Sequence, residues 1–155
     1  MSILLEGISK AFGRKVVLDG VDLEVREAET VAVIGTSGVG KSVLLKTIVG
    51  LLEPDAGRAI VDDRVVSELG REELYELRRR VGYVFQFAAL FDSMTVGENL
   101  AMGLRRMSDV DEAERVRRTA EALRLVELEG YEEQYPGQLS GGQRKRVGLA
   151  RAVVT

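Results

Sequence analysis

The chain has 155 residues, of which 45% are hydrophobic and 30% charged, and its formal net charge is −3. This length supports one domain with a single core, and the slight negative charge excludes the basic surface that general nucleic-acid binding requires. Cysteine and histidine are both absent, which excludes disulfides, thiolate metal sites and any chemistry that needs an imidazole.

The apolar segments are too short to cross a membrane. None approaches the roughly 18 residues that a spanning helix needs, and the longest, residues 43–52, is interrupted by Lys46. Glu6 interrupts the N-terminal segment where a signal peptide would be apolar. We therefore expect a cytoplasmic protein that reaches a membrane only through a partner.

Three stretches in the first half of the chain have strand patterns. Residues 21–27 alternate apolar and charged side chains, which is typical of a half-buried, antiparallel strand. Residues 3–9 and 58–66 are weaker strand candidates, and Asp62-Asp63 is the predicted turn inside the second of them.

Helical periodicity dominates after residue 70. Residues 71–80 predict a helix, and the arginines at 78–80 are interpreted as its solvated face. Residues 108–128 predict a longer helix, with Ser108 and Asp111 as a capping box. Its predicted apolar positions are Val116, Ala120 and Leu123. Residues 129–138 then interrupt the pattern with glycine and proline.

A short apolar run at 31–35 leads into a glycine-rich loop with the pattern G-x-x-x-x-G-K-S at 35–42. The run predicts a strand covered on both faces. A loop of this kind between a strand and a helix predicts a cradle in which backbone N–H groups surround phosphate oxygens. Lys41 would reach the β- and γ-phosphates, and the Ser42 hydroxyl would ligate Mg²⁺. The predicted binding residues are Gly35, Thr36, Ser37, Gly38, Val39, Gly40, Lys41 and Ser42.

The glycine-rich loop leaves other interpretations open. It could be a turn that only connects two elements, although its flanking strand and helix patterns favour nucleotide binding. Kinases, switch GTPases, motors and transport ATPases all use such a loop. A GTPase would normally add a base-reading Asn-Lys-x-Asp sequence, which the chain does not contain.

A second candidate phosphate site lies at Leu139–Gln143, with the sequence LSGGQ. Ser140 offers a hydroxyl, and the two glycines after it permit close backbone approach before a helix predicted to begin near Gln143. Arg144, Lys145 and Arg146 would oppose the dipole of that helix by about 0.3–1 kcal/mol each where exposed. An arriving anion would offset this cost; nearby acidic side chains are the alternative.

Three motifs in this order resemble the ATP-binding cassette (ABC) ATPases: residues 35–42, a glutamine ending VGYVFQ at 81–86, and LSGGQ at 139–143. The resemblance implies that Phe12 stacks on adenine, with core packing as the alternative. It implies that Gln86 contacts Mg²⁺ and the attacking water, with an exposed strand-end glutamine as the alternative. It also implies that two head-to-tail copies enclose two ATP–Mg²⁺. The residues closing over the partner's γ-phosphate would be Ser140, Gly141, Gly142 and Gln143.

The fold that this resemblance implies is α/β: a P-loop NTPase core, an N-terminal antiparallel β-subdomain and a helical subdomain, with an incomplete core sheet. One nucleotide-binding domain is expected over residues 1–155. Its expected parts are the antiparallel β region at 1–30 and 58–66, the P-loop core at 31–57 and 67–86, and the helical subdomain with the signature motif at 87–145.

Residues 87–100 are unusually apolar for a loop that leaves a strand. In the family this region receives a cytoplasmic helix of the transmembrane permease, and packing of the helical subdomain is the equal alternative. The sequences of 77–100 and of 35–52 are also similar to those of ATPases of Mla/MCE-type phospholipid importers. We therefore expect a transporter subunit, peripheral on the inner face of the cell membrane, whose cargo is lipid.

Two features of the family are missing from this sequence. Family members continue past the signature helix into a strand ending in Asp-Glu and then a γ-phosphate-sensing histidine, and neither occurs here. Because no matching carboxylate can orient the water, we expect the chain alone to bind ATP weakly and to hydrolyse it negligibly. The alternatives are a binding-only remnant and a non-transport ABC protein of the repair or translation type.

Overall fold

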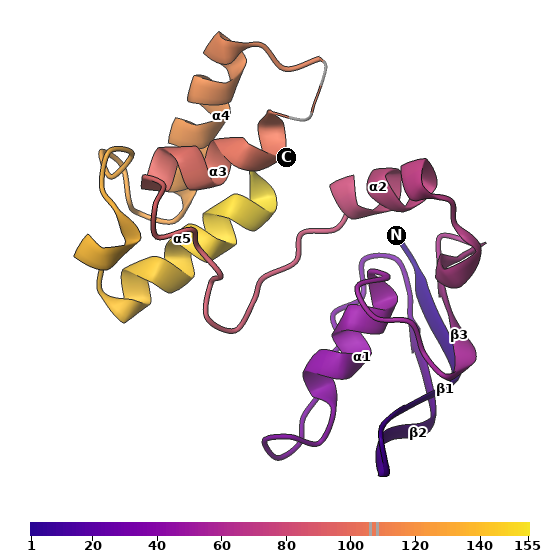
Figure 1. Ribbon diagram of the computed structural model, residues 1–155. Helices are drawn as coiled ribbons and strands as arrows, with labels where there is room; N and C mark the ends of the chain where they lie inside the picture. The colour runs from indigo at the N-terminus through magenta and orange to yellow at the C-terminus, as the bar shows by residue number, and fades with distance from the viewer. Residues whose placement is uncertain (106, 108) are drawn as a thin grey trace. The chain divides into compact units, whose positions relative to one another are not determined.

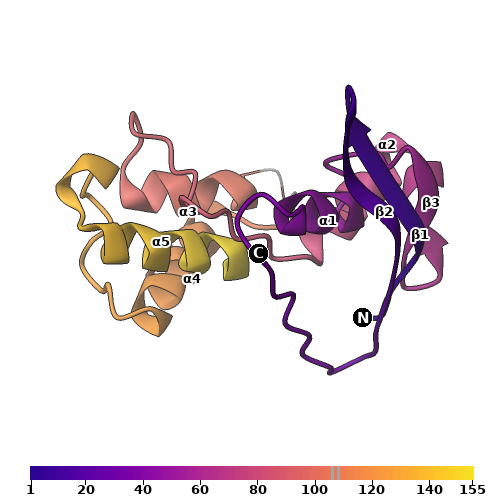
Figure 2. The same cartoon turned by 90° about the horizontal axis from the view of Figure 1, so that it is seen from below.

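The computed structural model describes residues 1–105, 107 and 109–155. The chain divides into two compact units, unit 1 at Met1–Arg78 and unit 2 at Arg79–Thr155. Figure 1 and the rotated view in Figure 2 show a sheet with helices in unit 1 and a packed group of helices in unit 2. The chain is thus an α/β protein with an antiparallel β region and a helical region, as the sequence predicted.

Unit 1 is built on a four-stranded sheet in the order β2-β1-β3-β4. All neighbouring strands are antiparallel, and Leu5 in the central strand lies opposite Leu23 on one side and Ala59 on the other. The strands are β1 at Ile3–Phe12, β2 at Lys15–Val25, β3 at Ala56–Val61 and β4 at Arg64–Val65.

The predicted strand patterns at 3–9, 21–27 and 58–66 are confirmed. Along β2, the apolar residues after Gly20 are half-buried and the charged residues between them are exposed. Asp62 and Asp63 form the turn between β3 and β4 with φ values of 46° and 62°. Two positive φ values are those of a type I′ hairpin turn, whose twist matches that of the flanking strands.

Unit 1 has two helices: α1 at Lys41–Ile48, which contacts β2 and β3, and α2 at Arg71–Arg79. A single 3-10 turn, η1 at Val66–Glu68, precedes α2. Arg78 donates to the carbonyls of Val49 and Gly50 at 3.0 and 2.7 Å. Arg78 is exposed, as the interpretation of residues 78–80 as a solvated face requires, but its guanidinium also anchors α2 to the end of α1.

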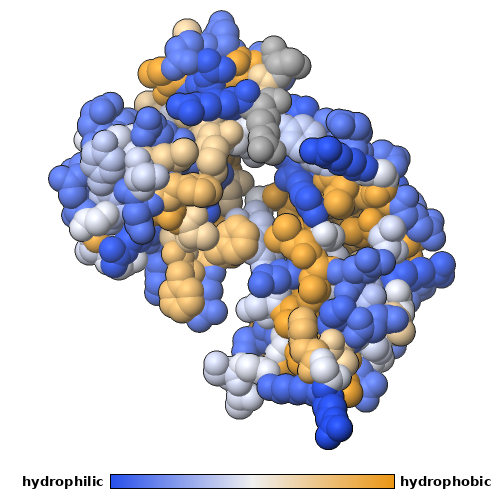
Figure 3. Space-filling model, in the orientation of Figure 1, coloured by the Kyte–Doolittle hydropathy of each residue, from blue (hydrophilic) through white to orange (hydrophobic). Residues whose placement is uncertain are grey.

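The strand predicted at 31–35 does not form in the described chain. These residues have no regular secondary structure, and Val31, Val33 and Ile34 are 39%, 41% and 92% exposed. A strand exists only when a neighbouring strand pairs with its backbone, and none of the described strands pairs with this segment. The core sheet is thus incomplete, as predicted. Figure 3 shows apolar surface on the visible face of unit 1 alongside α1.

Unit 2 is a helical subdomain around one apolar cluster. Its helices are α3 at Val96–Leu104, α4 at Glu112–Leu125 and α5 at Gly141–Val153, with a 3-10 turn, η2, at Pro136–Gln138. Among the described residues, no helix combines the length and apolarity that crossing a bilayer requires. The cluster consists of Val96, Leu100, Leu104, Met107, Val110, Ala122, Leu123, Val126, Leu128, Leu139, Val147, Ala150 and Val154.

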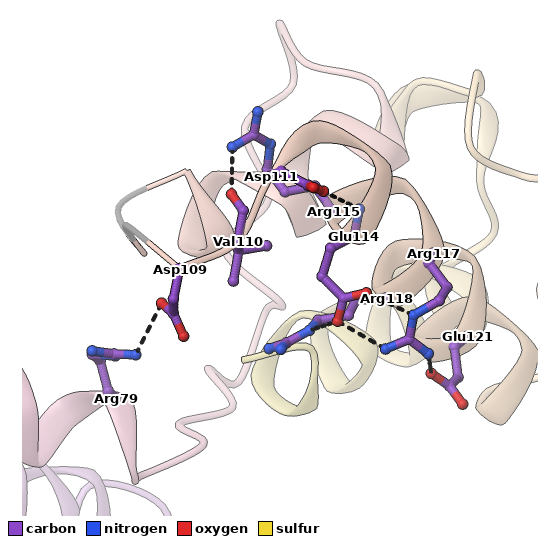
Figure 4. Close-up of polar contacts among 9 residues, drawn as sticks. All are labelled: Arg79, Asp109, Val110, Asp111, Glu114, Arg115, Arg117, Arg118 and Glu121. Carbon is purple, nitrogen blue, oxygen red and sulfur yellow. Dashed lines mark hydrogen bonds and ion pairs between the residues drawn. The ribbon is translucent and has the colours of Figure 1, made fainter.

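The helix predicted at 108–128 is shorter in the structure and is capped differently. Ser108, proposed as its cap, lies outside the described residues. Asp111 is the N-cap, and its carboxylate accepts a hydrogen bond from the Glu114 N–H at 2.8 Å (Figure 4). Leu123 is buried as predicted, but Val116 is 62% exposed. The core-facing side of α4 carries Thr119 and Ala122 instead, because helical spacing alone fits more than one face.

The exposed side of α4 carries a network of ion pairs around Glu114 (Figure 4). Its carboxylate accepts hydrogen bonds from Arg117 at 2.7 and 2.8 Å and from Arg118 at 2.7 Å. Arg117 also donates to Glu121 at 2.9 Å. The bonds from Arg117, followed by that from Arg118, lower the pKa of Glu114 from 4.5 to about 2.

The Glu114 network predicts a pH dependence of unfolding. Because the folded pKa lies below the unfolded one, the stabilisation is complete above about pH 4.5 and is lost as the pH falls through about 2. We expect E114Q to flatten the fall in unfolding free energy between pH 5 and pH 2, measured by urea unfolding. The double variant R117Q/R118Q should flatten it similarly, and an unchanged slope in E114Q would contradict the network's role.

Candidate nucleotide-binding site

The glycine-rich loop enters α1 through a backbone conformation that requires glycine. Gly40, the N-cap residue, has φ 112°, in the left-handed region. A Cβ at this position would meet the Val17 carbonyl oxygen at 2.9 Å and the Leu18 side chain at 3.0 Å. The loop therefore passes directly against β2, and glycine sets the direction in which α1 starts.

Positive charge and free donors gather at the start of α1. Gly40 has no side chain to cap the helix, so the first-turn N–H groups have no side-chain acceptor at the N-cap. The Lys41 ammonium donates to the carbonyls of Gly35 and Thr36 at 2.7 and 2.8 Å, which places it across the loop. Together with the helix dipole, this arrangement is suited to an anion.

The residues present fit Mg²⁺ held mainly by a nucleotide. Ser42, in the first turn of α1, is exposed and offers the oxygen ligand that this cation prefers. In the described part of the chain, no three carboxylate side chains gather as a metal site. Mg²⁺ usually takes few protein ligands and keeps phosphate oxygens and water, so a single hydroxyl beside a phosphate loop suits it.

Phe12 ends β1 opposite Lys15 and is 50% exposed. Such exposure does not agree with the core-packing alternative. The Lys10 ammonium lies 5.9 Å from the centroid of the ring, within the range of a cation–π contact. Phe12 thus presents an aromatic surface in unit 1, the unit that also contains residues 35–42.

The second candidate site is a capped helix start in unit 2. Ser140 is the N-cap of α5, so the helix begins at Gly141, two residues earlier than the predicted Gln143. The Ser140 hydroxyl accepts from the Gln143 N–H at 3.2 Å, and the Gln143 side-chain oxygen accepts from the Ser140 N–H at 2.8 Å. The spacing of Ser and Gln three residues apart is the sequence signal of this capping box.

Tyr131 is a site residue that the sequence reasoning missed. Its hydroxyl accepts a hydrogen bond from the side-chain nitrogen of Gln143 at 3.2 Å. Tyr131 therefore fixes the side chain that caps residues 139–143, which we call the Ser140 turn. The two partners are 12 positions apart in the sequence, and nothing local in the sequence signals the contact.

The surface around the Ser140 turn is open and cationic. A Cβ added to Gly141 or Gly142 would have no heavy atom within 4 Å, so nothing in the chain itself requires glycine there. Arg144 and Lys145 are exposed. Arg146 instead donates to the Val126 carbonyl at 3.0 Å. Its guanidinium also lies 3.6 Å from the Glu127 carboxylate, so among the described residues the alternative of compensation by nearby acidic groups finds support at this third cation.

Gln86 is exposed in unit 2 at the start of a turn rather than at the end of a strand, because residues 81–85 have no regular secondary structure. Some of the apolar residues after Gln86 are buried and others are exposed. Ala88 is 2% exposed and Leu90 packs on the helical core, whereas Phe87 is 86% exposed. The stretch 87–100 therefore contains both core residues and free apolar surface.

These features define a P-loop nucleotide-binding protein. Residues 18–155 match the family model described as ABC transporter, and the chain belongs to this family. Among relatives, the sulfate/thiosulfate import ATP-binding protein CysA of Caulobacter vibrioides is 47% identical over 99% of this chain. The probable ribonucleotide transport ATP-binding protein mkl of Mycobacterium leprae is 42% identical over 99% of it. The chain spans 44% of the length of each of these two relatives.

The solved structures lead to the same family. The chain is 33% identical to the dimeric ATP-binding cassette MJ0796 in a post-hydrolysis state bound to ADP and Pi, with a TM-score of 0.88. That match covers 98% of this chain and 69% of the other. A second dimeric structure of MJ0796 gives 34% identity and a TM-score of 0.89. The cassette fold is thereby established for this chain.

Proposed function

We propose that this chain is the ATP-binding part of an ABC transporter, which couples the binding and hydrolysis of ATP to transport. The observation that carries this proposal is the phosphate loop, in which Gly40 turns the backbone into α1 and Lys41 lies across the loop carbonyls. In this proposal Phe12 stacks on the adenine, Ser42 ligates Mg²⁺, and Gln86 contacts Mg²⁺ and the attacking water.

The Ser140 turn acts on the nucleotide of a second copy. Its support is the empty space around Gly141 and Gly142 and the exposed cations that follow them. An anion from a partner would offset the unfavourable charge of Arg144 and Lys145 at the start of α5. The related MJ0796 cassette is a dimer by the description of its structures, which agrees with a head-to-tail pair.

The permease docks on unit 2, through the exposed part of 87–100 and an adjoining hollow. This hollow of about 510 Å³ lies between α3 and α4, and small side chains such as Ala101 and Ala120 border it. Thr119 lies in it with a buried hydroxyl that lacks a hydrogen-bond partner among the described residues. The lining also carries Arg105 and Arg115, and Arg115 is paired with Glu112, so the charge of the hollow is mixed with an acidic excess. The acidic residues are Glu98, Glu112, Glu132 and Glu133.

The cargo is the least supported part of the proposal. Lipid transport rests on the resemblance of 35–52 and 77–100 to phospholipid importers, and it stays a prediction. Relatives are named for the import of sulfate/thiosulfate, methionine and Fe(3+) ions and for ribonucleotide transport. What these names share is transport of a solute, and this is the part of the cargo proposal that they support.

Replacing Gly142 tests the function of the Ser140 turn. Because the added methyl group meets open space inside α5, G142A should keep or raise the free energy of unfolding, by up to about 1 kcal/mol. The same methyl group would block close approach of a γ-phosphate. We therefore expect ATP and Mg²⁺ to shift the wild-type chain from monomer to dimer in sedimentation velocity, and to leave G142A monomeric.

A matched substitution separates this effect from helix propensity. G137A changes a glycine of η2 that also has open space around it, and it should leave nucleotide-dependent dimerisation intact. Dimerisation of G142A equal to that of the wild type would contradict the proposed role of the Ser140 turn.

A further inference from the structure

The backbone directly after Gln86 is held in an unfavourable conformation. Ala88 and Ala89 have φ values of 59° and 48°, in the left-handed region that residues with a Cβ adopt uncommonly. Such a residue is strained and persists only where its surroundings fix it. Two consecutive residues of this kind indicate that other parts of unit 2 impose the conformation.

Arg151, near the end of α5, is one of the groups that impose it. Its guanidinium donates to the Ala88 carbonyl at 2.6 Å and to the Ala89 carbonyl at 2.7 Å. A planar guanidinium holds two neighbouring carbonyls with a rigid fork of donors, whereas an ammonium on a flexible stem, such as that of Lys41, fixes their orientation less. Among the described residues, the hydrogen bonds of this guanidinium go to backbone carbonyls.

Gly148, one turn earlier on α5, is the second. A Cβ at Gly148 would lie 2.9 Å from the Ala88 Cβ and 3.1 Å from its Cα, so α5 touches the segment here as closely as backbone allows. Ala88 is 2% exposed as a result. Two residues of α5 thus hold Ala88: Gly148 packs against the Ala88 side chain, and Arg151 donates to the Ala88 carbonyl.

We propose that Arg151 is a positioning residue, which together with Gly148 fixes residues 86–89 to α5. Because Ser140 and Gln143 begin the same helix, the Ser140 turn and Gln86 then shift as one body. A displacement of α5 would move Gln86, and a displacement of the segment after Gln86 would move the Ser140 turn. The consequence for nucleotide chemistry rests on the proposed function, whereas the attachment itself does not.

Spin-label distances test the attachment in the whole chain without nucleotide. The chain has no cysteine, so F87C/K145C gives two labels at exposed positions of unit 2. We expect a narrow distance distribution, and a broader one when R151K is added. Exchange of the Ala88 and Ala89 amide hydrogens should become about tenfold faster in R151K. Unchanged distances and exchange in R151K would overturn the proposal.

Other variants separate attachment from a general loss of structure. R146K removes another guanidinium of α5 that donates to a backbone carbonyl, at Val126, and should leave the 87–145 distance distribution narrow. G148A should broaden it by displacing Ala88, and A88G should partly restore it by removing one of the two clashing methyl groups. Broadening by R146K equal to that by R151K would count against a specific role.

A nucleotide measurement then tests the effect on Gln86. R151K should bind a fluorescent ATP analogue without Mg²⁺ as the wild type does, and should lose most of the gain in affinity that Mg²⁺ gives the wild type. An equal Mg²⁺ gain in both would overturn the positioning of Gln86. Failure of the wild type to bind the analogue would contradict the proposed function, and the spectroscopic result would stand.

Discussion

Replacing Lys41 with alanine is expected to weaken binding of a fluorescent, non-hydrolysable ATP analogue by at least about 30-fold. The ammonium lies across the phosphate loop, 2.7 and 2.8 Å from two of its carbonyl oxygens. A triphosphate there would exchange these neutral acceptors for charged ones, which form stronger hydrogen bonds. Loss of one partner of such a charge pair costs about 2–5 kcal/mol, and about 2 kcal/mol corresponds to 30-fold.

The Lys41 variant has a matched control on the same helix. Lys46 is an exposed lysine in the last turn of α1, so K46A removes the same charge from the unit at the other end of the helix. K46A should bind the analogue within about twofold of the wild type if long-range charge contributes little. Circular dichroism should show both variants folded. Unchanged affinity in K41A would mean that the loop does not bind the nucleotide.

The local parts of the candidate site were predictable from the sequence. The loop at 35–42 and the helix after it follow from a spacing of residue types that has a direct physical basis, and the structure places α1 at Lys41. The start of α5 was predicted two residues late, although Ser140 and Gln143 carry the capping-box signal.

Contacts between distant segments were not predictable. The run at 31–35 has the composition of a buried strand, yet Ile34 is 92% exposed, because strand formation depends on a neighbour that composition does not specify. Arg78 and Arg151 are long cationic side chains, and charge runs are usually solvated. Both instead donate to backbone carbonyls, and only the tertiary structure shows where those carbonyls lie.

Replacing Asn99 with aspartate is expected to lower the free energy of unfolding of unit 2 by about 3 kcal/mol or more. Asn99, in the second turn of α3, is fully buried. Its side-chain nitrogen donates to the carbonyls of Phe91, Met94 and Thr95 at 3.1, 3.2 and 2.9 Å. Its side-chain oxygen accepts from the Phe91 N–H at 2.8 Å. One amide therefore satisfies most of the polar groups in the turn before α3.

The N99D change keeps the shape of the side chain but replaces its hydrogen-bond donor with a negatively charged acceptor. A carboxylate retains the acceptor for the Phe91 N–H but places a second oxygen against three carbonyl oxygens, in a fully buried position. Buried charge without a partner is among the largest single-residue penalties. Urea unfolding should show the loss, and Q134E, the same change on a partly exposed side chain, should cost less than about 0.5 kcal/mol.

Because Phe91 and Met94 belong to the proposed permease-docking stretch, N99D should also loosen that surface, seen as faster amide exchange at Phe91. Equal stability of N99D and Q134E would show that the amide does not organise this turn.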